Sequence, residues 1–216
     1  QHHGLNIYQR TGTPIHPMSP LAKIFWMKHE QPEIFQHTAY FLDIKSYILH
    51  QLFDTFVIDH SMASATGLFN LEKLDWDDEV LDLLGISRDQ LPKLVSTTHI
   101  LKGMKKRYAT LMGIDENTPV IVGASDGVLS NLGVNSYRKG EVAVTIGTSG
   151  AIRTVIDKPR TDYKGRIFCY VLTENHYVIG GPVNNGGVIL RWLRDGLLAS
   201  EVELSLIHIS EPTRQA

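Results

Sequence analysis

Residues 140–156 of this chain read GEVAVTIGTSGAIRTVI, and this stretch decides the fold. The runs EVAVTI and AIRTVI alternate apolar with polar residues on either side of the short turn GTSG, which is typical of a β-hairpin. Two more strand-like runs follow, RIFCYVL and HYVIG, joined by the polar residues TEN. The sequence therefore predicts three or four antiparallel strands in a row.

A helix is predicted directly after these strands, over residues 184–196 (NNGGVILRWLRDG). We expect Asn184 or Asn185 to cap this helix and its apolar residues to supply a packing surface. Strands in this order followed by a helix begin each half of the actin-like ATPase fold, also called the ribonuclease-H-like fold. We therefore predict an α/β protein of that fold. Because each half needs further strand and helix pairs, we expect it to be incomplete.

The first hundred residues are predicted to be mostly helical. Apolar residues at helical spacing indicate a helix over residues 19–29 with Ser19 as its N-cap. Two helical pieces are expected after Pro32, and a further helix over residues 75–85 that ends at Gly85. No strand-rich start precedes these helices, so we expect truncation at this end as well.

Composition excludes several classes of protein. With 216 residues, 43% of them hydrophobic and 20% charged, the chain can bury a sizeable core. A formal net charge of -2 with interspersed signs gives no basic stripe, which argues against nucleic acid as a partner. The absence of a long apolar run or signal-peptide pattern argues against a membrane partner and favours a cytoplasmic location. The single cysteine, Cys169, is expected in the core.

The last residues, SLIHISEPTRQA at positions 205–216, break the amphipathic pattern that precedes them. They resemble translated sequencing-adaptor read-through. We predict a non-native tail without function, and an ordinary loop with a short tail stays open as the alternative.

Asp126 is the first candidate for chemistry. The apolar run PVIVGA at residues 119–124 predicts a buried strand, and Asp126 lies just beyond its carboxyl end. Open α/β sheets bind ligands beyond the carboxyl ends of their strands. A carboxylate there can take the proton of a hydroxyl that attacks a phosphoryl group. Capping of the following helix is the competing interpretation of Asp126.

Two glycine-containing segments are candidates for phosphate binding. In the turn that holds Gly147 and Thr148, glycines allow backbone N–H groups to point at an anion and the hydroxyls add donors. The second segment is Gly186-Gly187 at the start of the predicted last helix. Free N–H groups at a helix start suit a nucleotide, and Arg191 lies one turn further on. An ordinary hairpin turn and simple helix capping are the alternatives.

Histidine and tryptophan supply fewer candidates. The ten histidines are scattered without metal-ligand spacing, so we predict no protein metal site. His16 is retained because it lies in the loop TGTPIHPMSP that leads into a helix. The three tryptophans, Trp26, Trp76 and Trp192, are assigned to packing.

Five segments together resemble the FGGY family of carbohydrate kinases: TGTPIHPMSPLAKIFWMK, DHSMASATGLFNLEKLDWDDEVLDLLGISRDQLPKL, GASDGVLSNLGV, GEVAVTIGTSGAIR and GGPVNNGGVILRWLRDG. They occur in the family's order across about residues 8–200. The resemblance implies that residues 1–133 belong to the sugar-binding N-terminal domain and that residues 134–204 begin the nucleotide-binding C-terminal domain. It also implies that Asp126 is the catalytic base.

The remaining site residues follow from the same resemblance. Gly147 and Thr148 are expected to contact phosphate, with Gly187 and Arg191 near the nucleotide. Contacts with the sugar or polyol are expected from His16, Met18, Ser125 and Gly127. ATP and Mg²⁺ are the implied cosubstrate and metal, and a homodimer stays open.

The loop HPMSP and the segment GGPVNNGG resemble the members that act on gluconate, which implies transfer of the γ-phosphoryl of ATP to the 6-hydroxyl of D-gluconate. Glycerol kinases differ, with an aromatic residue where Met18 stands and a glutamine in place of Gly127. Xylulose or glycerol as substrate stays an alternative. So does a non-catalytic sugar-binding protein of the same fold, against which Asp126 argues.

The family's N-terminal DxGT hairpin and its adenine-binding part have no counterpart in this sequence. We therefore expect the whole protein to be a kinase, and the 216-residue chain alone to show no measurable turnover.

Overall fold

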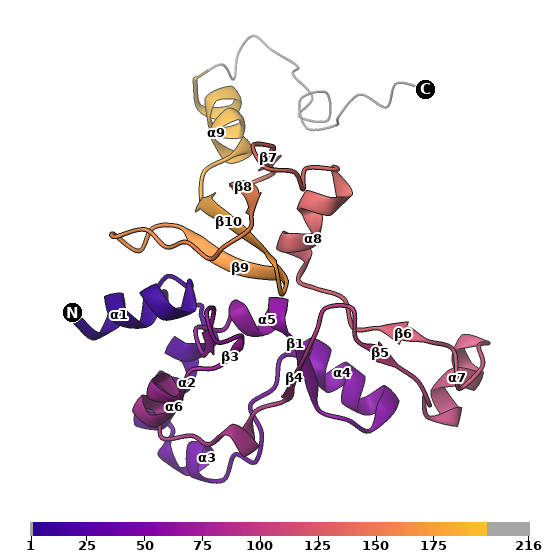
Figure 1. Ribbon diagram of the computed structural model, residues 1–216. Coiled ribbons are helices and arrows are strands. Elements are labelled where there is room, and N and C mark those ends of the chain that lie inside the picture. Colours follow the sequence, from indigo (N-terminus) through magenta and orange to yellow (C-terminus); the bar gives the residue numbers. More distant parts are fainter. Residues whose placement is uncertain (1, 198–216) are drawn as a thin grey trace.

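The computed structural model describes residues 2–197, and Figure 1 shows their arrangement. The helical elements are α1 (His2–Thr11), α2 (Pro20–Glu30), α3 (Pro32–Gln36), α4 (Ile44–Phe53), α5 (His60–Ser64), α6 (Asp78–Leu84), η1 (Arg88–Gln90), α7 (Lys106–Met112), α8 (Asp126–Gly133), α9 (Gly187–Trp192) and η2 (Leu193–Leu197). The strands are β1 (Val57–Asp59), β2 (Phe69–Asn70), β3 (Asp75–Trp76), β4 (Lys93–Val95), β5 (Ile100–Leu101), β6 (Val120–Ile121), β7 (Val142–Ile146), β8 (Gly150–Ile156), β9 (Phe168–Thr173) and β10 (His176–Val183).

The largest sheet has four antiparallel strands in the order β7-β8-β10-β9. Strands β7 and β8 form the predicted hairpin, in which Ile146 pairs with Gly150 across the GTSG turn. Strands β9 and β10 form a second hairpin, and α9 follows β10. The prediction of antiparallel strands followed by a helix is therefore confirmed.

The two faces of this sheet pack against different parts of the chain. On one face, Val128 of α8 joins a buried cluster with Val155 and Val178. On the other face, Cys169 and Val171 of β9 belong to the main core, which the first ninety-one residues largely build. The sheet therefore lies between α8 and the helical N-terminal part, as Figure 1 shows.

The helices of the N-terminal part follow their local signals. Ser19 caps α2, its hydroxyl accepting a hydrogen bond from the Ala22 N–H, and the two pieces after Pro32 are α3 and α4. Helix α6 ends at Gly85 as predicted, with a left-handed φ of 73°. The predicted start of α6 was too early, because residues 75 and 76 form β3 and the helix begins at Asp78.

Three other predictions were wrong. The run after Thr118 forms only β6, whose Ile121 is 61% exposed, because within residues 2–197 the strand paired with β6 is the equally short β5 and no other. Trp26 and Trp192 are exposed, whereas Trp76 is buried as predicted. Helix α9 is capped by Gly186 without a side-chain hydrogen bond, not by an asparagine.

Residues 198–216 lie outside the described residues, and with them the predicted tail at 205–216 and the last part of the predicted second domain. Within residues 2–197, no helix combines the length and apolar character needed to cross a lipid bilayer. Cys169 is fully buried as predicted, and this burial raises the pKa of its thiol to about 11.

A close backbone contact joins the N-terminal segment to the sheet. The Gly12 carbonyl accepts a hydrogen bond from the Cys169 N–H at 2.9 Å. Gly12 has a φ of +67°, and a Cβ there would lie 2.5 Å from Leu71 Cδ1 and 2.6 Å from the Cys169 oxygen. Only glycine fits both the dihedral and the space.

We predict that Gly12→Ala lowers the free energy of unfolding by about 3 kcal/mol, because it adds overpacking to an unfavourable φ. Gly113→Ala is the matched control, since its φ is +68° but nothing lies within 4 Å of the added Cβ. The control should lose only about 1 kcal/mol. Urea unfolding of both variants measures the difference, and equal losses would contradict the close packing.

A buried ion pair fixes α6 against α1. The Asp77 carboxylate, 3% exposed, accepts hydrogen bonds from Arg10 Nε at 2.8 Å and Nη2 at 3.1 Å, and from Asn70 at 2.9 Å. Burial by itself raises the pKa of the Asp77 carboxyl. The hydrogen bonds from Arg10 and Asn70 outweigh it, so the pKa lies below its usual value.

Because this pKa is lowered by folding, the stabilisation is present above about pH 4 and is lost as pH falls through the folded-state pKa. Asp77→Asn keeps a competent helix cap but removes the charge. We predict a loss of about 2 kcal/mol at pH 7 that shrinks below about pH 4. Asp78→Asn, at an exposed carboxylate, should cost about 0.5 kcal/mol or less. Denaturation at several pH values tests this, and a pH-independent loss at position 77 would refute it.

Candidate active site

Asp126 is the first residue of α8, and Ser125 is the N-cap. The side chain is exposed, and its Oδ1 accepts a hydrogen bond from the Gly127 N–H at 2.6 Å. Among residues 2–197, no cation forms an ion pair with Asp126. The second carboxylate oxygen is therefore available to accept a proton.

Ser61 of α5 holds the chain just before Asp126. The Ser125 N–H donates to Ser61 Oγ at 3.2 Å, and the Ser61 hydroxyl lies 3.4 Å from Ser125 Oγ. Ser61 is fully buried, whereas Ser125 is half-buried, so this contact is partly shielded from water. Sequence reasoning missed Ser61, because within the run SMASATG nothing distinguishes it from an ordinary small residue.

Helix α5 is itself held by a buried charge. Asp59 is fully buried, and its Oδ1 accepts a hydrogen bond from the Met62 N–H at 3.0 Å as the N-cap of α5. Its other oxygen forms an ion pair with Lys45, which also donates to the Val122 carbonyl at 3.3 Å. Lys45 thereby ties α4 to the segment that leads into Ser125.

The predicted phosphate turn and the start of α9 are in direct contact. The Gly186 N–H donates to the Thr148 carbonyl at 2.9 Å, and the Gly187 N–H donates to the Gly147 carbonyl at 2.6 Å. The structure thus brings Gly147, Thr148 and Gly187 together. It corrects the expectation that the N–H groups at the start of α9 are free for a nucleotide, because two of them hold the turn.

Close packing against the turn requires glycine at positions 186 and 187. A Cβ on Gly186 would lie 2.7 Å from the carbonyl oxygens of Gly147 and Ser149, and one on Gly187 would lie 3.0 Å from the Gly147 oxygen. Arg191 is exposed on α9. After the hydrogen bond from Arg194, the charge of Arg191 is among the causes that lower the pKa of Asp195.

Arg153 of β8 lies between the two parts of the candidate site. Its Nη1 donates to Thr145 Oγ1 at 3.1 Å, on the strand that leads into Gly147. Its Nη2 and Nε lie 3.8 and 3.9 Å from the position of a Cβ on Gly127, next to Asp126. One guanidinium therefore reaches the helix of the candidate base and the strand of the phosphate turn. Sequence reasoning did not single out Arg153.

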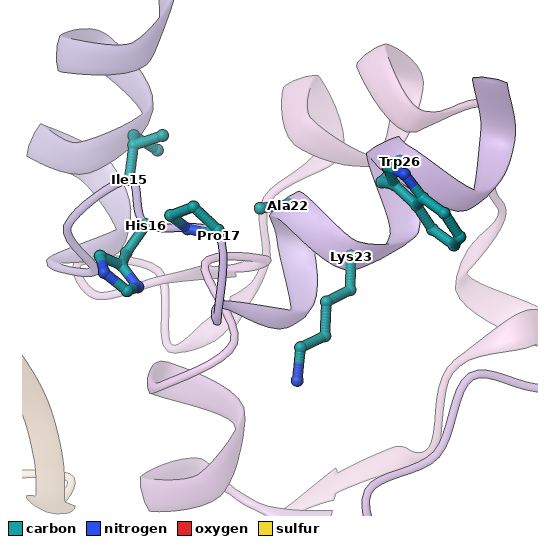
Figure 2. A pocket seen from close by; sticks show the side chains of 6 residues that line it. All are labelled: Ile15, His16, Pro17, Ala22, Lys23 and Trp26. Carbon is teal, nitrogen blue, oxygen red and sulfur yellow. The ribbon is translucent and has the colours of Figure 1, made fainter. Parts of the chain in front are cut away.

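The predicted sugar-binding loop, which holds His16 and Met18, directly precedes α2. A cavity of about 420 Å³ is lined there by Ile15, His16, Pro17, Ala22, Lys23 and Trp26. Figure 2 shows the ring of His16 and the indole of Trp26 at opposite ends of this group. Met18 is 72% exposed, and its N–H donates to His16 Nδ1 at 3.2 Å. Within residues 2–197, no hydrogen bond joins this loop to Asp126.

A second, more polar cavity of about 210 Å³ adjoins the start of α5. Its lining comprises His60, Ser96, Thr97, Thr98, Thr173, Glu174 and Asn175. Burial lowers the pKa of His60, and the charge of Glu174 only partly offsets this effect. In the described part of the chain, no cluster of three or more histidine, cysteine or carboxylate side chains is gathered for a metal ion.

Comparison with known proteins places this chain in a family. The model of the "FGGY family of carbohydrate kinases, N-terminal domain" matches residues 1–133. The chain belongs to the FGGY family of carbohydrate kinases.

Individual FGGY kinases agree with this assignment. The chain is 61% identical over 200 residues to a gluconokinase of Bacillus licheniformis. This alignment covers 93% of this chain and 39% of the gluconokinase. Two structures from Lactobacillus acidophilus each give a TM-score of 0.89 and cover 92% of this chain. One is a ligand-bound xylulose kinase, which is 44% identical and is covered over 41% of its own chain. The other is a gluconate kinase, which is 43% identical and is covered over 40% of its own chain.

These similarities confirm the predicted actin-like ATPase fold. The chain spans about two fifths of the length of the FGGY kinases it matches.

We predict that Ser61→Ala exposes the Ser125 amide, because this half-buried N–H loses its acceptor at a cost of about 1 kcal/mol. Hydrogen exchange at Ser125 should accelerate by about tenfold. Ser130→Ala is the control, since the Ser130 hydroxyl donates to the Gly127 carbonyl within the same helix but does not touch the Ser125 amide. Unchanged exchange at Ser125 in the Ser61 variant would show that this contact does not hold α8.

Proposed function

We propose that the whole protein carrying this sequence transfers the γ-phosphoryl of ATP to D-gluconate and releases 6-phosphogluconate. The observation that carries the proposal is the 61% identity to a gluconokinase across 93% of this chain. An exposed carboxylate, held at the start of α8 and without an ion pair to any described residue, is what the reaction needs as its base. The geometry of Asp126 therefore supports the same conclusion.

In this reaction Asp126 accepts the proton of the substrate's 6-hydroxyl. The oxygen attacks the γ-phosphorus in line, so that a new P–O bond forms while the bond from the γ-phosphorus to the bridging oxygen of ADP breaks. The Gly127 N–H, bonded to Oδ1, keeps the carboxylate oriented. The second oxygen then faces the hydroxyl.

The Gly147–Thr148 turn is proposed to hold the phosphates of ATP, with Gly187 supporting the turn and Arg191 on the nucleotide side. Mg²⁺ is bound in such sites through phosphate oxygens, waters and one or two carboxylates. The ion would be held mainly by the phosphate oxygens and would neutralise phosphate charge. Contacts with the sugar are proposed for His16, Met18, Ser125 and Gly127.

We further propose that residues 1–133 belong to a sugar-binding domain and residues 134–204 to a nucleotide-binding domain. The tight contact between the phosphate turn and α9 fits this division, because both elements lie in the second segment. A cytoplasmic location is proposed because ATP is the phosphoryl donor.

A coupled assay of ADP release by the whole protein tests the function against gluconate, xylulose and glycerol. We expect turnover with gluconate to exceed that with the other two. Xylulose belongs in the panel because a xylulose kinase structure matches this chain as well as a gluconate kinase structure does. Preference for xylulose or glycerol would refute gluconate as substrate. The 216-residue chain assayed alone should show no turnover.

We predict that Asp126→Asn in the whole protein lowers kcat by about 1,000-fold, because an amide cannot take the proton. Asp157→Asn is the matched control, since this exposed carboxylate follows β8 at the end opposite Gly150. The control should keep full activity. Equal activity of the Asp126 variant and the unsubstituted protein would remove Asp126 from the mechanism, and absence of any ATP turnover would favour a non-catalytic sugar-binding role.

A further inference from the structure

Arg153 occupies an unusual place in the sheet. It lies on β8 between Ala143 of β7 and Gly180 of β10, and is half-buried. A Cβ on Gly180 would come within 3.1 Å of Arg153 Cγ, so the missing side chain at position 180 leaves room for the arginine stem. The guanidinium extends from there toward α8, where Gly127 lies.

This guanidinium has no negative partner in the described part of the chain. Arg10, Arg88 and Arg166 each form ion pairs with carboxylates, whereas no carboxylate lies within 4 Å of Arg153 among residues 2–197. The hydrogen bond to Thr145 is to a neutral hydroxyl and uses only Nη1. A planar, half-buried cation with free donors is suited to a phosphate or carboxylate ligand.

The neighbours of Arg153 narrow the choice of ligand. Its guanidinium lies 3.8 Å from where a Cβ on Gly127, the residue after the proposed base, would be, and it donates to Thr145, two residues before the phosphate turn. The Asp126 carboxylate forms no ion pair with it, so the base stays free for the substrate hydroxyl while the cation stays free for an anion. In gluconate the carboxylate lies at the opposite end of the carbon chain from the hydroxyl that reacts. The anion nearest to Asp126 is therefore the phosphoryl group.

We propose that Arg153 is a further catalytic residue, which contacts the oxygens of the phosphoryl group while it passes from ATP to the substrate hydroxyl. This inference rests on the proposed kinase function. Arg153 transfers no proton and forms no covalent bond. It neutralises charge on the phosphoryl oxygens as the bond to ADP breaks, and Thr145 fixes its orientation.

Steady-state kinetics of the whole protein test this role. We expect Arg153→Ala to lower kcat by about 100-fold to 1,000-fold, with KM for gluconate changed by about threefold or less. Added guanidinium ion should restore part of the activity, which a merely structural defect would not allow. Thr145→Val should lose about tenfold, because it removes only the orienting contact. Arg107→Met, at an exposed arginine on α7 that contacts Tyr108, is the control and should retain full activity.

Thermal unfolding of each variant separates misfolding from a catalytic loss, and Arg153→Met provides a second variant that keeps an apolar stem over Gly180. A raised KM for gluconate with unchanged kcat would overturn the proposal, because it would assign Arg153 to the sugar carboxylate. Unchanged kinetics would overturn it as well. If the unsubstituted protein prefers another polyol, the assignment of gluconate as substrate fails. The Arg153 variants are then compared with that polyol as substrate, and the same loss of kcat is expected. Inactivity with every polyol would overturn both.

Discussion

Two buried serines on the five-residue helix α5 join three distant segments, and the candidate site depends on them. Ser61 Oγ accepts a hydrogen bond from the Ser125 N–H, just before the proposed base. Ser64 Oγ accepts from the Val171 N–H on β9 at 2.9 Å, while the Ser64 carbonyl accepts from Thr13. An unpaired amide in such a buried place costs about 1–3 kcal/mol, so these contacts fix the sheet, the N-terminal loop and α8 relative to one another.

The alternation of side chains along β8 decides what faces the proposed base. Arg153 and Val155 point to the same face of the sheet because they are two residues apart. Val155 packs with Val128 of α8, so α8 is held on that face and Gly127 comes to lie beside the guanidinium. A slip of one residue between β7 and β8 would turn Arg153 to the opposite face and separate the cation from the base. The hydrophobic cluster under α8 therefore aligns the chemistry as well as stabilising the fold.

The phosphate turn owes its shape to backbone contacts. The start of α9 donates two N–H groups to the carbonyls of Gly147 and Thr148, at distances that leave no space for a side chain on Gly186. The first turn of α9 thus acts as a support for the GTSG turn. If the turn holds ATP phosphates as proposed, those two N–H groups are already used, so a neighbouring cation such as Arg153 carries more of the phosphate charge.

The sequence by itself determined the features that depend on residues close together in the chain. The cap of Ser19 on α2, the stop at Gly85 and the β7–β8 hairpin each arise from local dihedral preferences and hydrogen bonds, and all three were predicted. The resemblance also placed the chain in its family and singled out Asp126. Only the tertiary structure decided that Ser61 holds Ser125, that Cys169 bonds to Gly12 and that the Arg153 guanidinium lies near Gly127. These partners are far apart along the chain, and what joins them is the packing of whole helices and strands, which no local pattern encodes.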